Sequence, residues 1–311
     1  MIRPADLRPR PRATATTRRR GHRGRILVWL PPALWLGLFL LVPLFVVAKI
    51  SLSQSVLAQP PYSPLVEWLA DGLVEIRLNL GNYLWLIEDR LYLDAYLESI
   101  RIAAVSTVLC LLIGYPMAYV VARARQPWGT VLLVLVVLPF WTSFLLRVYA
   151  WIGLLGRQGP INQALLALGL IDEPLTMLQT EFSVYVGIVY SYLPFMILPI
   201  YANLVKLDRT LEDAAADLGA PPLRSFLTVT LPLSRPGVIA GVMLVFIPAI
   251  GEFVIPALLG GPDTLMIGRV LWDEFFANRD WPVASAVAIA IIVLVVGPIV
   301  ALRNRSGGSL V

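Results

Sequence analysis

The chain has 311 residues, of which 58% are hydrophobic and only 14% are charged, and its mean hydropathy is +0.76. Soluble domains are about 45–50% apolar and about 25% charged, so this composition excludes a fold around one aqueous core and indicates a bundle of membrane helices. The net charge of +5 lies in one tail and a few short loops, which fits membrane topology and argues against nucleic acid as a partner. The single cysteine, Cys110, excludes an intrachain disulfide.

Residues 1–25 are rich in arginine and precede an apolar run that is too long for a typical signal-peptide core. No small-residue cleavage site follows this run, so we expect a retained signal anchor rather than a transit peptide. Anionic lipid headgroups are the expected partner of the tail.

Six segments are long enough to cross a bilayer, which takes roughly 20 mostly apolar residues. They are residues 26–48, 98–122, 129–152, 183–205, 237–258 and 283–302. Each contains proline, which indicates either a bundle that bends around a path or only the higher frequency of proline in membrane helices.

The basic residues predict the orientation of these spans. Seventeen Lys or Arg residues lie in the two tails and the loops 123–128 and 206–236, against five on the opposite side. The positive-inside rule therefore predicts that both termini, including the tail 303–311, are cytoplasmic. Fourteen acidic residues fall on the outer side, where they would concentrate a cationic solute, although ordinary solvated loops have the same composition.

The outer segment 49–97 is long enough to need structure of its own. Residues 74–80 alternate strictly between apolar and polar, which predicts a strand, and residues 81–93 are amphipathic and are expected to lie along the membrane surface. A second outer segment, residues 159–169, predicts a short helix that begins after Pro160.

Several kinds of chemistry are absent from the sequence. Neither of the two lysines follows a glycine, so the phosphate-binding pattern G-x-x-x-x-G-K-S/T is missing and the chain has no ATPase site of its own. The one histidine, His22, lies in the tail, which excludes His-based metal sites and Ser-His catalysis. We therefore expect a transport subunit with no catalytic residue, no metal site and no cofactor.

The loop 206–236 predicts a short cytoplasmic helix. Thr210 and Asp213 have the spacing of a capping box, helix-forming residues continue to Leu218, and Gly219 then ends the helix. A glycine at this place would also allow another backbone to approach closely. On this pattern alone, a surface helix that packs only against the bundle is equally possible.

This loop resembles the EAA loop of binding-protein-dependent ABC importer permeases, with the pattern E-A-A-x-x-L-G-A followed by F-x-x-V-x-L-P-L and P-G. Residues 213–220 fit the first part, and Phe226, Val229, residues 231–233 and residues 236–237 fit the rest, although Asp213 replaces the glutamate. The resemblance implies an all-α membrane protein with the six-helix, MetI-like architecture of type I importers, whose permease core here is residues 98–302. It also implies that the loop helix docks on a cytoplasmic ATPase, and the docking contact is assigned to Asp213, Ala214, Ala215 and Gly219.

Four further segments, residues 138–151, 192–201, 251–263 and 278–282, are similar to the polyamine branch of this family, and putrescine permeases are the nearest in pattern. This resemblance implies a complex of two different permease subunits, two ATPase subunits that bind the ATP, and a periplasmic polyamine-binding protein. Spermidine permeases share the architecture, so spermidine or another cationic solute stays an alternative to putrescine.

Glu252 is the one clear acid within the predicted spans, about 22 Å from the cytoplasmic start of the fifth span. A carboxylate at this depth is costly and marks a functional candidate. The aromatic residues that could line the path of a cationic substrate together with Glu252 are Trp141, Tyr149, Trp151 and Tyr192. Glu252 could instead pair with Arg147 and only hold the bundle together, or serve a proton-coupled carrier. A membrane scaffold or enzyme is a third class, but neither it nor such a carrier would require an ATPase-docking loop.

Overall fold

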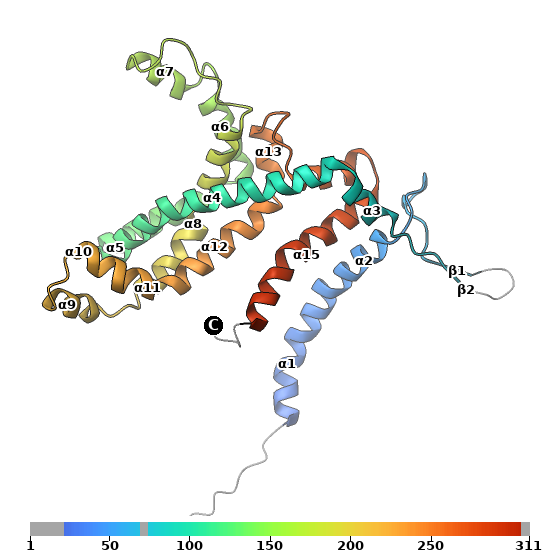
Figure 1. Ribbon diagram of the computed structural model, residues 1–311, viewed down its shortest axis with the longest axis horizontal. Helices are drawn as coiled ribbons and strands as arrows, with labels where there is room; N and C mark the ends of the chain where they lie inside the picture. Colours follow the sequence, from blue (N-terminus) through green and yellow to red (C-terminus); the bar gives the residue numbers. More distant parts are fainter. Residues whose placement is uncertain (1–21, 69–73, 306–311) are drawn as a thin grey trace, which may run out of the picture. The chain divides into compact units, whose positions relative to one another are not determined.

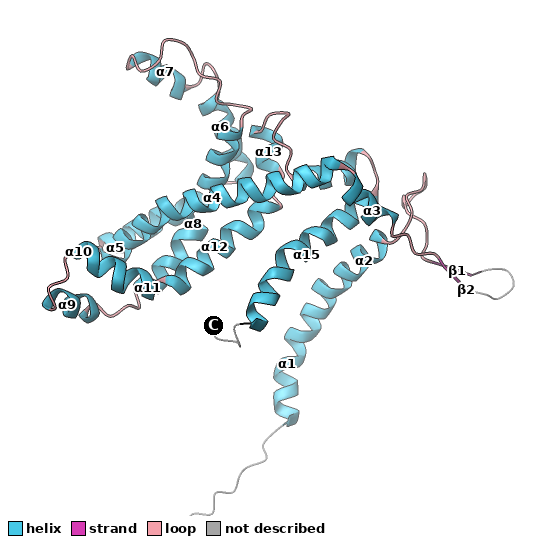
Figure 2. Cartoon of the chain, in the orientation of Figure 1, coloured by secondary structure: helices cyan, strands magenta, loops and turns pink. Residues whose placement is uncertain are grey.

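The computed structural model describes residues 22–68 and 74–305, which are mostly helical (Figures 1 and 2). Most of the arginine-rich tail, at residues 1–21, lies outside the described residues, as do residues 69–73 of the outer segment and the C-terminal residues 306–311. The chain forms two compact units, Met1–Val46 and Val47–Val311.

The first helical stretch consists of α1 (His22–Leu36), a π-helical turn η1 (Gly37–Leu41) and α2 (Val42–Ser51). Residues Val28–Ser51 are long enough to cross a membrane, and an 18-residue window within them has a mean hydropathy of 2.3. Large apolar side chains such as Trp29, Leu38 and Phe45 are exposed along this stretch, which suits a helix whose solvent is lipid. The predicted first span is present, and its helix begins at His22 rather than at residue 26.

Three further single helices are long and apolar enough to span: α4 (Arg90–Arg123), α8 (Glu181–Leu204) and, in its segment Trp281–Pro298, α15 (Trp281–Arg305). Two bent pairs complete the set. In the first pair, α5 (Trp128–Val137) and the 3-10 turn η2 (Leu138–Trp141) meet α6 (Phe144–Leu155) and α7 (Pro160–Ala167) at 92°. In the second, α10 (Pro222–Ser225), η3 (Phe226–Thr230) and α11 (Leu231–Leu233) meet α12 (Arg235–Ile250) at 64°. Counting each bent pair as one span gives the predicted six.

Two of the predicted spans are not continuous helices, and on this point the sequence prediction is wrong. The span 129–152 breaks at Thr142 and Ser143, just after a turn that contains Pro139. The span 237–258 ends at Ile250 and resumes as α13 (Val254–Leu259). Proline cannot donate the helical hydrogen bond and obstructs the preceding turn. This explains why α5 gives way to a 3-10 turn at Pro139, and why α13, with Pro256 in its first turn, does not continue back into α12.

Helices α4, α8 and α12 pack side by side as the centre of the second unit (Figure 1). Close approach depends on glycine: a Cβ on Gly237 of α12 would lie 2.7 Å from Asn203 Cβ and 2.9 Å from the Pro199 carbonyl oxygen of α8. Lipid is as apolar as the helices, so there is no hydrophobic driving force for their association in a membrane. Small residues instead allow the close packing contacts that hold membrane helices together. Helix α15 joins this core through buried Val283, Ala286 and Val287.

The outer segment carries a two-stranded antiparallel sheet, β1 (Val66–Trp68) with β2 (Val74–Ile76). The predicted strand over residues 74–80 is therefore confirmed only for its first half. The amphipathic stretch 81–93 is divided between α3 (Gly81–Glu88) and the start of α4, because Asp89 ends one helix and accepts a hydrogen bond from Leu91 N in the next. The helix expected after Pro160 is confirmed as α7. The remaining short elements are α14 (Ile267–Trp272) and η4 (Asp273–Ala277).

Candidate functional site

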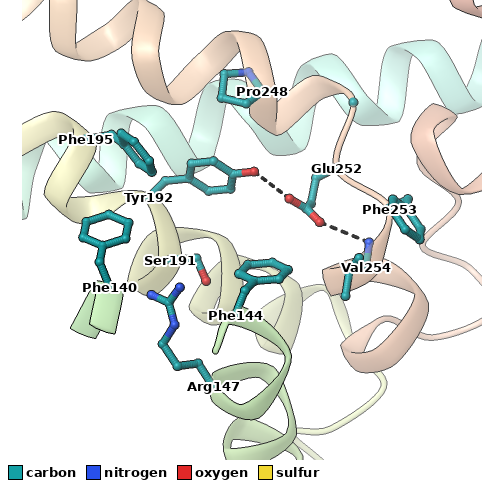
Figure 3. Close-up of a pocket in the computed structure, with 11 residues that line it drawn as sticks. Phe140, Phe144, Arg147, Ser191, Tyr192, Phe195, Pro248, Glu252, Phe253 and Val254 are labelled. Carbon is teal, nitrogen blue, oxygen red and sulfur yellow. Dashed lines mark hydrogen bonds between the residues drawn. The ribbon is translucent and has the colours of Figure 1, made fainter. Parts of the chain in front are cut away.

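A cavity of about 500 Å³ lies where both helix breaks meet α8 (Figure 3). One acid, one arginine and several aromatic rings contribute to its wall. The lining residues are Phe140, Phe144, Arg147, Ser191, Tyr192, Phe195, Pro248, Gly251, Glu252, Phe253 and Val254.

Glu252 lies in the non-helical break between α12 and α13, not within a helix as the sequence predicted. Its Oε2 atom accepts a hydrogen bond from the Tyr192 hydroxyl at 2.6 Å, and its Oε1 atom accepts from Val254 N at 3.1 Å and from Ile255 N at 3.4 Å (Figure 3). The carboxylate thereby satisfies backbone N–H groups at the start of α13. The residue is only 8% exposed and still lines the cavity.

Arg147 of α6 lines the same cavity, but it forms no ion pair with Glu252 among the described residues. Its guanidinium carbon lies 5.6 Å from the ring centre of Phe140 and 5.8 Å from that of Phe144. Its Nε and Nη1 atoms are buried with no hydrogen-bond partner in the described part of the chain. Figure 3 shows the guanidinium on the Phe140 side of the cavity. The pairing of Glu252 with Arg147 that the sequence left open is absent.

The structure brings only one of the four aromatic candidates to Glu252. Tyr192 lies in the wall, whereas Trp141 is 82% exposed, Tyr149 is 56% exposed, and neither lines the cavity. Trp151 packs edge-to-face on Tyr190 at 5.4 Å, away from the lining set.

Four phenylalanines supply the aromatic wall instead, and the sequence analysis missed them: Phe140, Phe144, Phe195 and Phe253. Phe144 and Arg147 are three residues apart within α6, a spacing that places both side chains on one helix face. This spacing was the signal that could have identified part of the wall.

The cytoplasmic helix predicted in the loop 206–236 is α9 (Thr210–Asp217). Its start differs from the predicted capping box, because no side-chain hydrogen bond joins Thr210 and Asp213. Asp208 performs this role: its Oδ1 atom accepts from Thr210 N at 3.0 Å. The same hydrogen bond lowers the pKa of the Asp208 carboxyl below its usual value, because an N–H donor favours the ionised form.

Helix α9 ends as the sequence predicted. Gly219 has φ +81°, and the two closing bonds run from Ala220 N to the Ala215 carbonyl at 3.0 Å and from Gly219 N to the Ala216 carbonyl at 2.8 Å. This is a Schellman motif, in which glycine takes the left-handed position without strain. Glycine is therefore required at position 219 to end the helix, independently of any contact with a partner protein.

The faces of α9 differ in exposure. Of the residues assigned to docking, Asp213, Ala214 and Gly219 are exposed, whereas Ala215 is half-buried. Leu218 is 89% exposed and, together with exposed Leu211, was missed. Leu211, Ala214 and Leu218 share one face by their spacing of three and four residues, so the exposed side of α9 carries a small apolar stripe.

Residues 102–303 match the family of binding-protein-dependent transport system inner membrane components. The chain belongs to this family. The permease is 43% identical over 217 residues to the spermidine/putrescine transport system permease protein PotB of Haemophilus influenzae, covering 70% of this chain and 76% of that protein. It is 40% identical over 223 residues to PotB of Escherichia coli K12, covering 72% and 81%.

Solved structures show the same fold at low sequence identity. A bacterial ABC transporter involved in the import of the acidic polysaccharide alginate matches with a TM-score of 0.67 and 15% identity, covering 91% of the permease and 96% of that chain. The MetNI methionine ABC transporter matches with a TM-score of 0.53 and 17% identity, covering 74% and 98%. The expected type I importer architecture is confirmed, and the permease is a multi-pass inner-membrane protein.

Proposed function

We propose that this permease is one of two different membrane subunits of an ATP-driven importer that moves a polyamine, preferentially putrescine, into the cytoplasm by alternating access. The observation that carries the proposal is the cavity in which one buried carboxylate, Glu252, stands among aromatic rings. The relatives named as spermidine/putrescine permeases support the same substrate class.

The chemistry of the cavity suits an alkyl diammonium ion. Glu252 offers a carboxylate to one ammonium group, and the rings of Phe140, Phe144 and Phe253 offer apolar surface to the methylene chain. Cation–π contacts to such rings contribute roughly 0.5–2 kcal/mol each. A single carboxylate opposed by Arg147 favours a substrate of low charge, which is the reason for preferring putrescine over spermidine.

Helix α9 supports the proposed partners. Its exposed stripe of Leu211, Ala214 and Leu218, flanked by Asp213 and Asp217, suits an apolar groove of a cytoplasmic ATPase. In this arrangement two ATPase subunits bind the ATP, a second permease completes the pathway, and a periplasmic polyamine-binding protein delivers the substrate. The permease itself needs no cofactor.

Uptake measurements test this function directly. Cells that lack the permease should lose ATP-dependent uptake of labelled putrescine, and a plasmid copy should restore it. Uptake of labelled spermidine in the same strains decides between the two amines. Uptake that survives ATP depletion and is abolished by a protonophore would instead indicate a proton-coupled carrier.

The orientation of the permease is part of the proposal, with both termini in the cytoplasm. Reporter fusions after Arg303 should behave as cytoplasmic, and fusions at Asp172 or Asp273 as external. An external C-terminus would place α9 on the wrong side for an ATPase and would overturn the proposed coupling.

A further inference from the structure

The side chain of Glu212 forms the polar contacts between helix α9 and the membrane bundle. Within the described residues, α9 contains no buried residue, and only Glu212 and Ala215 on its inner face are half-buried. The Glu212 Oε1 atom accepts hydrogen bonds from Arg123 Nη2 and, at 2.7 Å, from the Thr230 hydroxyl. Arg123 is the last residue of α4, and Thr230 ends η3. One carboxylate therefore joins α9 and the nearby η3 to the end of α4, which is 89 positions away in the sequence.

This ion pair differs from the others in the described ranges. The side chains of Arg123 and Glu212 are 18% and 25% exposed, whereas the arginines of the outer-face pairs, Arg77 and Arg101, are more than half exposed. Exposed pairs contribute little because water and salt screen them. A shielded pair depends strongly on both partners, since removing one leaves a buried charge without its counterion.

The arginine is itself fixed by the membrane bundle. Its guanidinium carbon lies 5.4 Å from the ring centre of Tyr119, one turn earlier in α4. Tyr119 and Tyr115 both pack edge-to-face against Phe226 of η3, at 5.8 Å and 5.7 Å. The Tyr115 hydroxyl is 2.8 Å from the buried Ser234 hydroxyl, directly before α12. The cytoplasmic end of α4 is thus packed rigidly against the segment that leads from α9 into α12.

We propose that Arg123 and Glu212 are a positioning pair that sets the orientation of α9 and transmits its displacement to the cytoplasmic end of α4. The inference rests on the proposed function, in which the outer face of α9 docks on the ATPase. Because Glu212 lies on a different face of α9 from the stripe of Leu211, Ala214 and Leu218, it contacts the bundle while the stripe stays exposed. A movement of α9 therefore reaches α4 through a shielded, charge-assisted contact rather than through a flexible loop.

The test uses the complete complex of both permeases, the ATPase and the binding protein, reconstituted in proteoliposomes. The measured quantity is the amount of putrescine transported per ATP hydrolysed. Glu212→Gln and Arg123→Gln should each lower this ratio about tenfold or more while the ATPase stays associated. The reversed pair, Glu212→Arg with Arg123→Glu, should recover at least a third of the parental ratio, because the attraction is restored without the contact to Tyr119. Arg101→Gln, which removes an exposed arginine and its ion pairs with Glu98 and Glu181, is the matched control and should stay within twofold.

The outcomes separate the two proposals. Single variants that keep the parental ratio would overturn the positioning role, even if the parent complex transports putrescine. A parent complex that neither retains the ATPase nor transports a polyamine would refute the proposed function instead. If the single variants fail to assemble, the reversed pair decides: an assembled and coupled complex supports the inference, and an assembled but uncoupled complex overturns it.

Discussion

Replacing Glu252 by glutamine removes the negative charge of the cavity while keeping the shape of the side chain. The amide oxygen can still accept the hydrogen bond from Val254 N, and the Tyr192 hydroxyl can turn to accept from the amide nitrogen. The start of α13 therefore keeps its acceptor. What is lost is the carboxylate available to a substrate ammonium group, so the change acts on binding more than on folding.

The size of the effect follows from the contact that disappears. A hydrogen bond to a charged group contributes about 1.5–3 kcal/mol, and every 1.4 kcal/mol corresponds to a tenfold change in affinity. We therefore expect Glu252→Gln to weaken the apparent affinity for putrescine by roughly 10- to 150-fold. The Tyr192 ring remains, so residual low-affinity transport should persist at high substrate concentration.

The assay is concentration-dependent uptake of labelled putrescine at equal permease abundance, with complex assembly checked by co-purification of the ATPase. Tyr192→Phe is the matched control: it removes the hydroxyl 2.6 Å from Glu252 and keeps the ring. Its loss of apparent affinity for putrescine should be several-fold smaller than that of Glu252→Gln. Unchanged uptake by Glu252→Gln would refute the substrate role of the carboxylate. Loss of assembly without residual transport would show that the negative charge of Glu252 is needed mainly for the structure around the helix break.

The remaining predictions concern the second charge of the cavity, the end of α9 and helix packing. Arg147→Gln removes a positive charge whose repulsion of the cationic substrate is worth roughly 1 kcal/mol across such a cavity. The apparent affinity for putrescine should therefore rise about fivefold, and weaker uptake would contradict this. The Gly219→Arg permease should insert normally, but its complex should hydrolyse ATP without transport. A φ of +81° strains any side chain, and the added bulk would hold α9 away from its partner. Normal coupling at equal abundance would argue against docking. Gly237→Leu should destabilise the detergent-solubilised permease by about 1–3 kcal/mol, because its Cβ would meet Asn203 at 2.7 Å. Gly153→Ala, with open space around it in α6, should not lower the melting temperature.

Composition and hydropathy were sufficient to predict the membrane class, the six spans and the short helices α7 and α9. These features depend on long apolar runs and on local signals such as Pro160 and Gly219, which act within a few residues. The two helix breaks were not predicted. Proline occurs in every predicted span, and whether it kinks or interrupts a helix depends on the neighbouring groups that take over the freed hydrogen bonds.

The candidate site was predicted only in part, for the same reason. Glu252 was identified because a single acid in an apolar segment is conspicuous, and Tyr192 because it belongs to a neighbouring span. Phe140 and Phe253 were missed because their inward placement depends on the breaks that re-aim the chain. Likewise the contact of Glu212 with Arg123 joins residues 89 positions apart, and no local pattern indicates it.

The breaks also explain why the cavity has its charge. Where α12 stops at Ile250, the backbone N–H groups that open α13 need an acceptor, and lipid supplies none. Glu252 supplies that acceptor with Oε1, while Oε2 points across the cavity to Tyr192. The helix break thus stabilises a carboxylate that would otherwise be too costly at this depth. Glu252 therefore has two roles: its Oε1 atom accepts hydrogen bonds at the start of α13, and its Oε2 atom is available to a cationic substrate. Only a variant that keeps the acceptor and removes the charge can distinguish these roles.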